Sequence, residues 1–508
     1  MNLLSSTTVF SFYTMLSRVL GYFRDILIAI FLGTSIYADA FFVAFRLPNT
    51  FRRLFAEGTF NAAFIPSYSS EKLKSKAKGK KFADEVLTLL TLGLLVVVFI
   101  VEIFTPYVVY LIAPGFIVDG NKFNLAVDLT RITFPFLAFV SLSSFFAGIL
   151  NTENKFAAAA AAPIFLNLIL ILSLVISYYF ELDYALNLSY GVSLSGLIQL
   201  IFLIFFASKY YQPSLVFKKK IRQKVQFFLK KLLPSIFSSG VIQISILVGT
   251  IIASFQSGAV SYLYYADRVY QINLAIAGIA VSTVSLPILS KLIKNNKIHQ
   301  ANKIQNKSLE LSLLLSLPAS IALIIGSDEI VNALFGYGSF TENDIEQTSL
   351  ALRYFGFGIP AFAVLKIFAN FFFARDNTMT PFRISSIVVT INVLISVLLF
   401  KQVGFVIIPI ATTLSTWIGV VYYLHILLKI GYLKIESKFY TRFTKIIFST
   451  TIMSYVFHNS INYFAKNLNY SSDYKILYLL IIVILVALLY FLICYFLKVF
   501  NLRSFKTN

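Results

Sequence analysis

Long apolar runs, separated by short polar segments, recur along the whole chain of 508 residues. A run of about 20 apolar residues is long enough to cross the hydrocarbon core of a bilayer as an α-helix. Such runs lie at about 6–32, 37–66, 83–112, 126–150, 157–180, 187–208, 232–256, 260–290, 308–327, 347–374, 384–400, 404–428, 444–464 and 476–497. We therefore predict an all-α polytopic membrane protein with 14 transmembrane helices.

Basic residues concentrate in alternate loops of this pattern. Of the 43 Lys and Arg residues, 30 lie in the loops after the even-numbered helices or at the end of the chain. The opposite loops hold only Lys122, Lys401, Lys466 and Lys475. Because cytoplasmic loops of membrane proteins carry the excess of Lys and Arg, both termini are expected in the cytoplasm. The same asymmetry explains the net charge of +21, and we expect no nucleic-acid partner.

Composition agrees with a membrane protein, since 58% of the residues are hydrophobic and only 13% are charged. The single cysteine, Cys494, excludes an internal disulfide. The three histidines are scattered and do not have the spacing of metal ligands. We therefore expect no metal site and no cofactor.

The second half of the chain repeats features of the first, which predicts a duplicated transporter fold. At offsets of 222, 223 and 225 residues, the matching positions are Arg46 and Arg268, Gly115 and Gly338, and Pro135 and Pro360. Six helices per half would give two lobes in parallel orientation, related by a pseudo-twofold axis along the membrane normal. The predicted organisation is an N-lobe at 1–208, a cytoplasmic amphipathic linker at 209–231, a C-lobe at 232–428 and two further helices at 429–508.

Charged side chains inside the first two predicted helices are the main functional signal. A charge within a membrane helix is costly and normally faces a wet cavity or a partner. The basic residues of this stretch are Arg18, Arg24, Arg46, Arg52 and Arg53, and the acidic and polar residues near them are Ser17, Asp25, Asp39, Asn49 and Glu57. Positive charge is in surplus, which predicts a cavity that binds an anion.

The spacing of these residues leaves two interpretations open. Arg18 and Asp25 lie seven residues apart and share a helix face, as do Ser17 and Arg24. The alternative to anion binding is internal pairing of Arg24 or Arg18 with Asp25 or Asp39, which would only fix the packing.

Arginines further along the chain allow similar alternatives. Arg53 and Glu57 have the spacing of a helical ion pair and could form a gate or reach to the membrane surface. Arg268, in the second half, would face the arginines of the second helix across the centre or pair locally with Asp267.

Several segments resemble the MurJ (MviN) family of lipid II flippases. They read SRVLGYFRD, ADAFFVAFRLPN, FRRLFAEG, IAPGF, ILNTENKF and YYADR, in this order along the chain. The resemblance implies two six-helix lobes, a terminal helix pair that forms a groove for a lipid tail, and a central cationic cavity. It also implies a substrate, the undecaprenyl-diphosphate-linked peptidoglycan precursor, which the protein would move from the inner to the outer leaflet of the bacterial cytoplasmic membrane.

The resemblance also suggests roles for individual residues. The expected substrate contacts are Arg18, Arg24, Arg52, Arg268, Asn49 and Ser17. The expected gating or ion-pair residues are Asp25, Asp39, Arg46, Arg53, Glu57 and Asp267. Some members of the family carry a sodium-binding aspartate in the seventh helix, where this sequence reads SILVGTIIASF without an acid. Membrane lipids are expected partners, and the resemblance leaves other cell-wall synthesis proteins open.

Other functions fit the residues less well. A flippase or exporter for another lipid-linked oligosaccharide would need the same cationic cavity. The surplus of positive charge disfavours an exporter of cationic drugs. A polyprenyl-dependent membrane glycosyltransferase would need carboxylates on a sizeable outer loop, and the longest candidate, at 328–346, has no room for a catalytic domain. We therefore expect a transporter rather than an enzyme.

Overall fold

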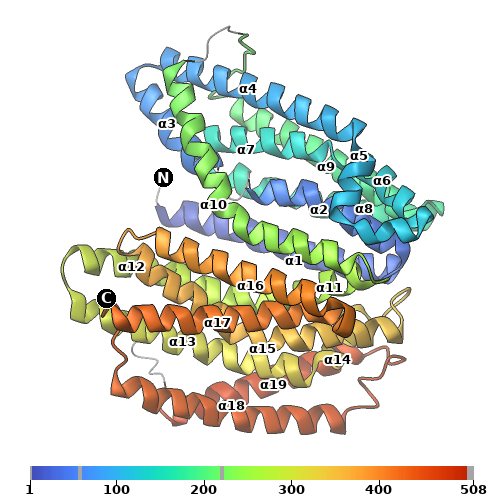
Figure 1. Ribbon diagram of the computed structural model, residues 1–508, viewed down its shortest axis with the longest axis vertical. Helices are drawn as coiled ribbons and strands as arrows, with labels where there is room; N and C mark the ends of the chain where they lie inside the picture. Colours follow the sequence, from blue (N-terminus) through green and yellow to red (C-terminus); the bar gives the residue numbers. More distant parts are fainter. Residues whose placement is uncertain (1–2, 55–59, 218–221, 500–508) are drawn as a thin grey trace. The chain divides into compact units, whose positions relative to one another are not determined.

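The computed structural model describes residues 3–54, 60–217 and 222–499, and every regular element among them is helical (Figure 1). Helices are the expected result, because a backbone in hydrocarbon must satisfy its N–H and C=O groups within its own segment. The prediction of an all-α protein is confirmed.

Nine segments of the described residues are long and apolar enough to cross a membrane. They are Lys76–Ile103, Gly120–Thr152, Phe156–Phe180, Tyr184–Ala207, Ala259–Lys294, Ile298–Ile325, Glu342–Phe373, Met379–Lys429 and Lys475–Phe496. The 51 residues of Met379–Lys429 comprise two long helices. The chain is therefore a polytopic membrane protein, and the count of 14 helices stays a prediction.

Contacts divide the chain into two compact units, Met1–Ser261 and Tyr262–Asn508. The helices of the first unit are α1 (Leu3–Leu32), α2 (Ile36–Leu54), α3 (Phe60–Lys74), α4 (Lys76–Ile103), α5 (Thr105–Ile112), η2 (Pro114–Val118), α6 (Gly120–Thr133), α7 (Phe136–Thr152), α8 (Phe156–Phe180), α9 (Tyr184–Ala207) and α10 (Gln223–Ala253). The units meet in sequence inside α11 (Ala259–Leu274). The six-helix lobes predicted from the repeat stay a prediction.

Within the first unit, α8 packs against α1 and α9, and α3, α4 and α7 lie side by side (Figure 1). Aromatic rings hold this second group together. The Phe64 ring of α3 stacks on Tyr68 at 5.5 Å and meets Phe145 of α7 at 5.0 Å. Aromatic pairs of this kind contribute about 0.5–1.5 kcal/mol beyond their buried area. They fix the end of α3 beside α7.

The second unit contains the remaining helices, which are η3 (Ala275–Ala280), α12 (Val281–Lys294), α13 (Ile298–Ile325), α14 (Ser327–Phe335), α15 (Glu342–Phe373), α16 (Met379–Val403), η4 (Gly404–Val406), α17 (Ile407–Lys429), α18 (Ser437–Tyr463) and α19 (Lys475–Phe496). Its centre is α15, which packs against α13 and α17. The two last helices, α18 and α19, run side by side at the red end of the colour scale, and α18 packs on α13 (Figure 1).

A π-helical segment, η3, joins α11 to α12. Its Gly278 lies so close to α15 that a Cβ atom there would be 3.1 Å from the Cα of Ala363. The absence of a side chain at this position lets the wide π-turn approach α15.

The basic segment after α9 is helical only in its second part. Residues 211–217 form no regular element, and α10 begins at Gln223. The end of the predicted linker therefore forms the first turns of α10.

Candidate substrate-binding site

The charges of α1 form a buried network with α8. Arg24 donates from Nε and Nη2 to Oδ1 of Asp25, at 3.0 and 2.5 Å, and from Nη1 to Oδ1 of Asn167, at 2.9 Å. Only 5% of Arg24 and 2% of Asp25 are exposed. A buried guanidinium needs such partners, because removing an ion from water without compensation is expensive.

Asn167 also fixes the position of Ser17. Its Nδ2 donates to the carbonyl oxygen of Ser17 at 2.8 Å and to Oγ at 3.3 Å. Gly21 lies between Ser17 and Arg24 on α1, and a Cβ atom at Gly21 would be 3.4 Å from the Asn167 amide. One asparagine on α8 therefore connects Ser17 and Arg24, which the sequence placed on one face of α1.

Arg18 has a different environment. It is exposed, and no ion-pair or hydrogen-bond partner is found for it among the described residues. Its guanidinium is therefore available to an external anion.

Asp39 is completely buried and connects three parts of the first unit. Oδ2 accepts from Nζ of Lys122 at 2.6 Å and from the amide of Gly258 at 3.0 Å. Oδ1 accepts from the amide and the hydroxyl of Ser261, at 3.0 and 2.6 Å. The carboxylate therefore holds α2, α6 and the turn between α10 and α11 together.

Lys122 lies between two apolar runs of the sequence, in the first turn of α6, and is only 5% exposed. Its assignment to the external side of the membrane stays a prediction. The Phe116 ring covers its ammonium at 4.2 Å. The cation that pairs with Asp39 is therefore a lysine 83 residues away, and not an arginine of α1.

In α2, Arg52 donates from Nε to Oδ1 of Asn49 at 3.0 Å, and both residues are half-buried. Pro48 lies inside the helix one residue earlier. A proline removes a backbone donor, so the carbonyls of this turn need other partners. Arg46, two residues before the proline, is also half-buried.

Two of the predicted gating residues cannot be placed. Glu57 lies outside the described residues, and for Arg53 only the backbone, within α2, is described. Their predicted ion pair stays a prediction.

In the second unit, Arg268 and Asp267 are both half-buried on α11. Arg268 donates from Nη2 to the Tyr264 hydroxyl at 2.8 Å, and its guanidinium carbon lies 4.6 Å from the centre of that ring. Asp267 accepts a hydrogen bond from Gln271. A tyrosine one turn away therefore orients this arginine.

Sequence reasoning missed the residues that orient the charges. Asn167 is the one amide side chain in its apolar run, which is a usable signal, but nothing in the sequence connects it with Arg24. Tyr264 lies four residues before Arg268, a spacing that brings two helical side chains together, whereas Lys122 carries no such signal because its pairing with Asp39 depends on packing.

Comparison with known proteins identifies the family of the chain. The sequence model of a family described as "Lipid II flippase MurJ" matches residues 28–479. The probable lipid II flippase MurJ of Rickettsia prowazekii (strain Madrid E) is 35% identical over 505 residues, which cover 99% of each chain. That of Rhizobium tropici is 37% identical over 446 residues, which cover 87% of this chain and 84% of the relative.

Solved structures of similar fold include a member of the same family. A structure described as "Lipid II flippase MurJ, inward closed conformation" superposes with a TM-score of 0.82 at 28% identity, covering 97% of this chain and 99% of the other. An inward-facing multidrug resistance MATE transporter of the MOP superfamily shares the fold, with a TM-score of 0.67 at 14% identity, covering 84% of this chain and 98% of that one. By sequence and by fold, this chain belongs to the MurJ family of lipid II flippases.

Proposed function

We propose that this protein moves lipid II, the undecaprenyl-diphosphate-linked peptidoglycan precursor, from the cytoplasmic to the periplasmic leaflet by alternating access. The observation that carries the proposal is the surplus of arginine on α1, where Arg24 is already paired with Asp25 while Arg18 is exposed and has no partner among the described residues. The relatives named lipid II flippase support the same substrate. The protein would lie in the bacterial cytoplasmic membrane with both termini in the cytoplasm.

The chemistry of the substrate fits arginine. A diphosphate carries at least two negative charges and several acceptor oxygens, and a guanidinium can bind them through two parallel hydrogen bonds. Arg18, Arg24, Arg52 and Arg268 are the proposed phosphate ligands, with Ser17 and Asn49 as neutral donors. The lipid tail never leaves the hydrocarbon, so the protein has to shelter only the polar headgroup.

Substitution of the four arginines tests this function. We expect Arg18→Ala, Arg24→Ala, Arg52→Ala and Arg268→Ala each to abolish growth in a strain depleted of its own flippase, with protein still in the membrane. Lysine should rescue poorly, because an ammonium cannot form the paired hydrogen bonds of a guanidinium. Arg131→Ala is the matched control. Arg131 is half-exposed, and it pairs with Asp128 of its own helix at 3.9 Å.

The leaflet location of the precursors separates this function from transport of another lipid-linked oligosaccharide. Depletion should leave lipid II in the inner leaflet while other lipid-linked sugars still cross. Growth of all four alanine variants, or accumulation of a different precursor, contradicts the proposal.

We further propose that the contacts of Asp39 with Lys122, Gly258 and Ser261 form a gate. Asp39 belongs to the predicted gating residues, and its carboxylate connects elements that are far apart in sequence. Release of Lys122 and Ser261 together would free α2 from α6 and from the start of α11. This would give the transport cycle one closed and one open arrangement.

The membrane potential is the proposed driving force, because the seventh predicted helix has no acid at the sodium position. An anionic headgroup moving outward runs downhill in a cell with a negative interior. At roughly 2.3 kcal/mol per charge per 100 mV, two charges gain about 4.6 kcal/mol. Collapse of the potential by valinomycin and potassium should therefore stop flipping, whereas removal of sodium should not. The reverse pattern would refute this coupling.

A further inference from the structure

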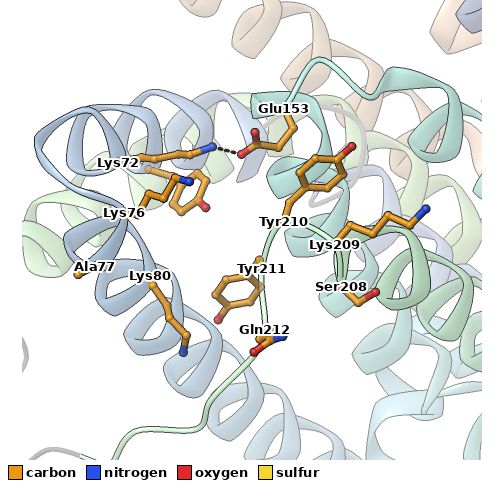
Figure 2. A pocket seen from close by; sticks show the side chains of 11 residues that line it. Lys72, Lys76, Ala77, Lys80, Glu153, Ser208, Lys209, Tyr210, Tyr211 and Gln212 are labelled. Carbon is orange, nitrogen blue, oxygen red and sulfur yellow. Dashed lines mark hydrogen bonds and ion pairs between the residues drawn. The ribbon is translucent and has the colours of Figure 1, made fainter.

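A basic cavity of about 470 Å³ lies in the first unit, apart from the arginines described above. Figure 2 shows Lys72, Lys76 and Lys80 along one side and the segment 208–212 along the other. The lining contains four lysines, with Lys209 as the fourth, but only one carboxylate, Glu153. The lining therefore carries an excess of positive charge.

The partners of these lysines differ. Lys72 pairs with Glu153 across the cavity (Figure 2). Lys80 donates to Asp84 and to Ser214, both at 2.9 Å. Lys76 is exposed and has neither an ion pair nor a hydrogen bond among the described residues. The ammonium of Lys76 is thus available to a ligand.

Two buried tyrosines make the wall rigid. The Tyr211 hydroxyl donates to Oδ1 of Asp84 at 2.7 Å, and only 4% of Tyr211 is exposed. Burial, together with the smaller effects of the nearby Glu153 and Asp84, raises the pKa of Tyr68 to about 12. Both rings are therefore neutral at physiological pH and do not repel an anion.

The cavity also lies at the ends of the predicted membrane-spanning runs. Its residues lie between the predicted runs at 37–66 and 83–112, between those at 126–150 and 157–180, or at and just after the end of the run at 187–208. On α9, Ile201 and Phe205 are 57% and 67% exposed and lie about two turns and one turn before Lys209, respectively. An apolar, exposed helix face therefore leads to the rim of the cavity, where Lys209 extends outward (Figure 2).

We propose that this cavity binds a phosphate group presented at the membrane surface. Phosphate matches the excess of lysine, since lysine acts as a point charge for such groups. The exposed face of α9 would accommodate the chains of an anionic phospholipid whose headgroup enters the cavity. The cavity shares no residue with the arginine set, so the outcome is independent of the proposed flippase activity.

Ligand-dependent thermal stability of the purified full chain tests the site. A ligand that binds only the folded protein raises its unfolding midpoint, and the concentration dependence gives the dissociation constant. In an uncharged detergent, we expect saturable stabilisation by dihexanoyl phosphatidylglycerol but not by dihexanoyl phosphatidylcholine. Lys76→Gln should weaken binding on the order of tenfold, because it removes a hydrogen bond to a charged group. Lys81→Gln is the matched control, since Lys81 is exposed on the same helix and does not line the cavity.

Inorganic phosphate distinguishes the two sources of the ligand. Stabilisation by phosphate that also depends on Lys76 would support a site for free phosphate, and stabilisation by phosphatidylglycerol alone would support a lipid headgroup. Binding of neither probe, or equal binding to the native chain and to Lys76→Gln, would overturn the proposal.

Discussion

Single residues of the helices carry charge in two different environments. Arg24 is buried and bound by Asp25 and Asn167, whereas Arg18, six residues earlier, is exposed. A buried and paired guanidinium is held in place before any substrate arrives, and an exposed one must be ordered by it. We therefore assign the orienting role in substrate binding to Arg24 and the capturing role to Arg18.

The Asn167 side chain should be needed for transport, because it holds Arg24 in position. Asn167→Ala removes a partner of Arg24 and leaves buried polar groups unsatisfied, at a cost of about 1–3 kcal/mol. We expect loss of complementation in a flippase-depleted strain. Asn187→Ala is the matched control, because Asn187 bonds a serine carbonyl and a serine hydroxyl in the same way but contacts no arginine. If the two variants impair complementation equally, Asn167 contributes to packing and not to the position of Arg24.

Lys122 should contribute far more to stability than an arginine on the same helix. Lys122→Gln leaves the Asp39 carboxylate buried without its cation, which costs about 3–5 kcal/mol. Arg131→Gln breaks an exposed pair with Asp128 and should cost less than about 1 kcal/mol. The thermal unfolding midpoints in detergent measure the difference, and similar midpoints for the two variants would contradict the buried pair.

At the level of elements, one glycine lets η2 touch the end of α10. The Gly115 amide donates to the Ser254 hydroxyl at 3.0 Å, and a Cβ atom at Gly115 would be 2.4 Å from the Ser254 carbonyl oxygen. Two atoms that are not bonded to each other cannot lie this close. The backbones of η2 and of the end of α10 would therefore have to move apart if Gly115 carried a side chain. The contact depends on the sequence IAPGF, which the family resemblance had already singled out.

Gly115→Ala should therefore lower the unfolding midpoint and slow transport, because η2 can no longer dock on α10. A Gly93→Ala variant provides the comparison, since nothing lies within 4 Å of a Cβ atom there. In the interior of α4 that change should be neutral or stabilising by up to about 1 kcal/mol. A Gly115→Ala protein as stable as the Gly93→Ala protein would show that the contact is dispensable.

Across the whole molecule, the sequence predicted what depends on local pattern. The helical class and the membrane character follow from apolar runs, which need no knowledge of neighbours. The orienting contacts do not follow, because Asp39 and Lys122 are 83 residues apart and Arg24 and Asn167 are 143 apart. Several residues could have paired with each charge, and only packing selects among them. The asparagine in the apolar run of α8 and the four-residue spacing of Tyr264 and Arg268 were the visible signs.

Orientation in the membrane is a prediction for the whole chain. Cysteines at Lys76 and Lys297 should be shielded from an impermeant thiol reagent added outside intact cells, and a cysteine at Ser339 should react. All three positions are exposed, whereas the native Cys494 is buried and gives little background. Labelling at Lys76 or Lys297 without labelling at Ser339 would reverse the orientation.

The π-turn η3 determines the direction in which Arg268 points. A π-turn spans one residue more than an α-turn, and each helical residue rotates the chain by about 100°. Side chains before and after Ala275–Ala280 are therefore out of phase with an unbroken helix. Relaxation of the wide turn to a regular α-helix would rotate Arg268 by about 100° around the helix axis relative to α12, which packs on α13 and α15. Arg268, a proposed phosphate ligand, would then change its direction within a helix that stays folded.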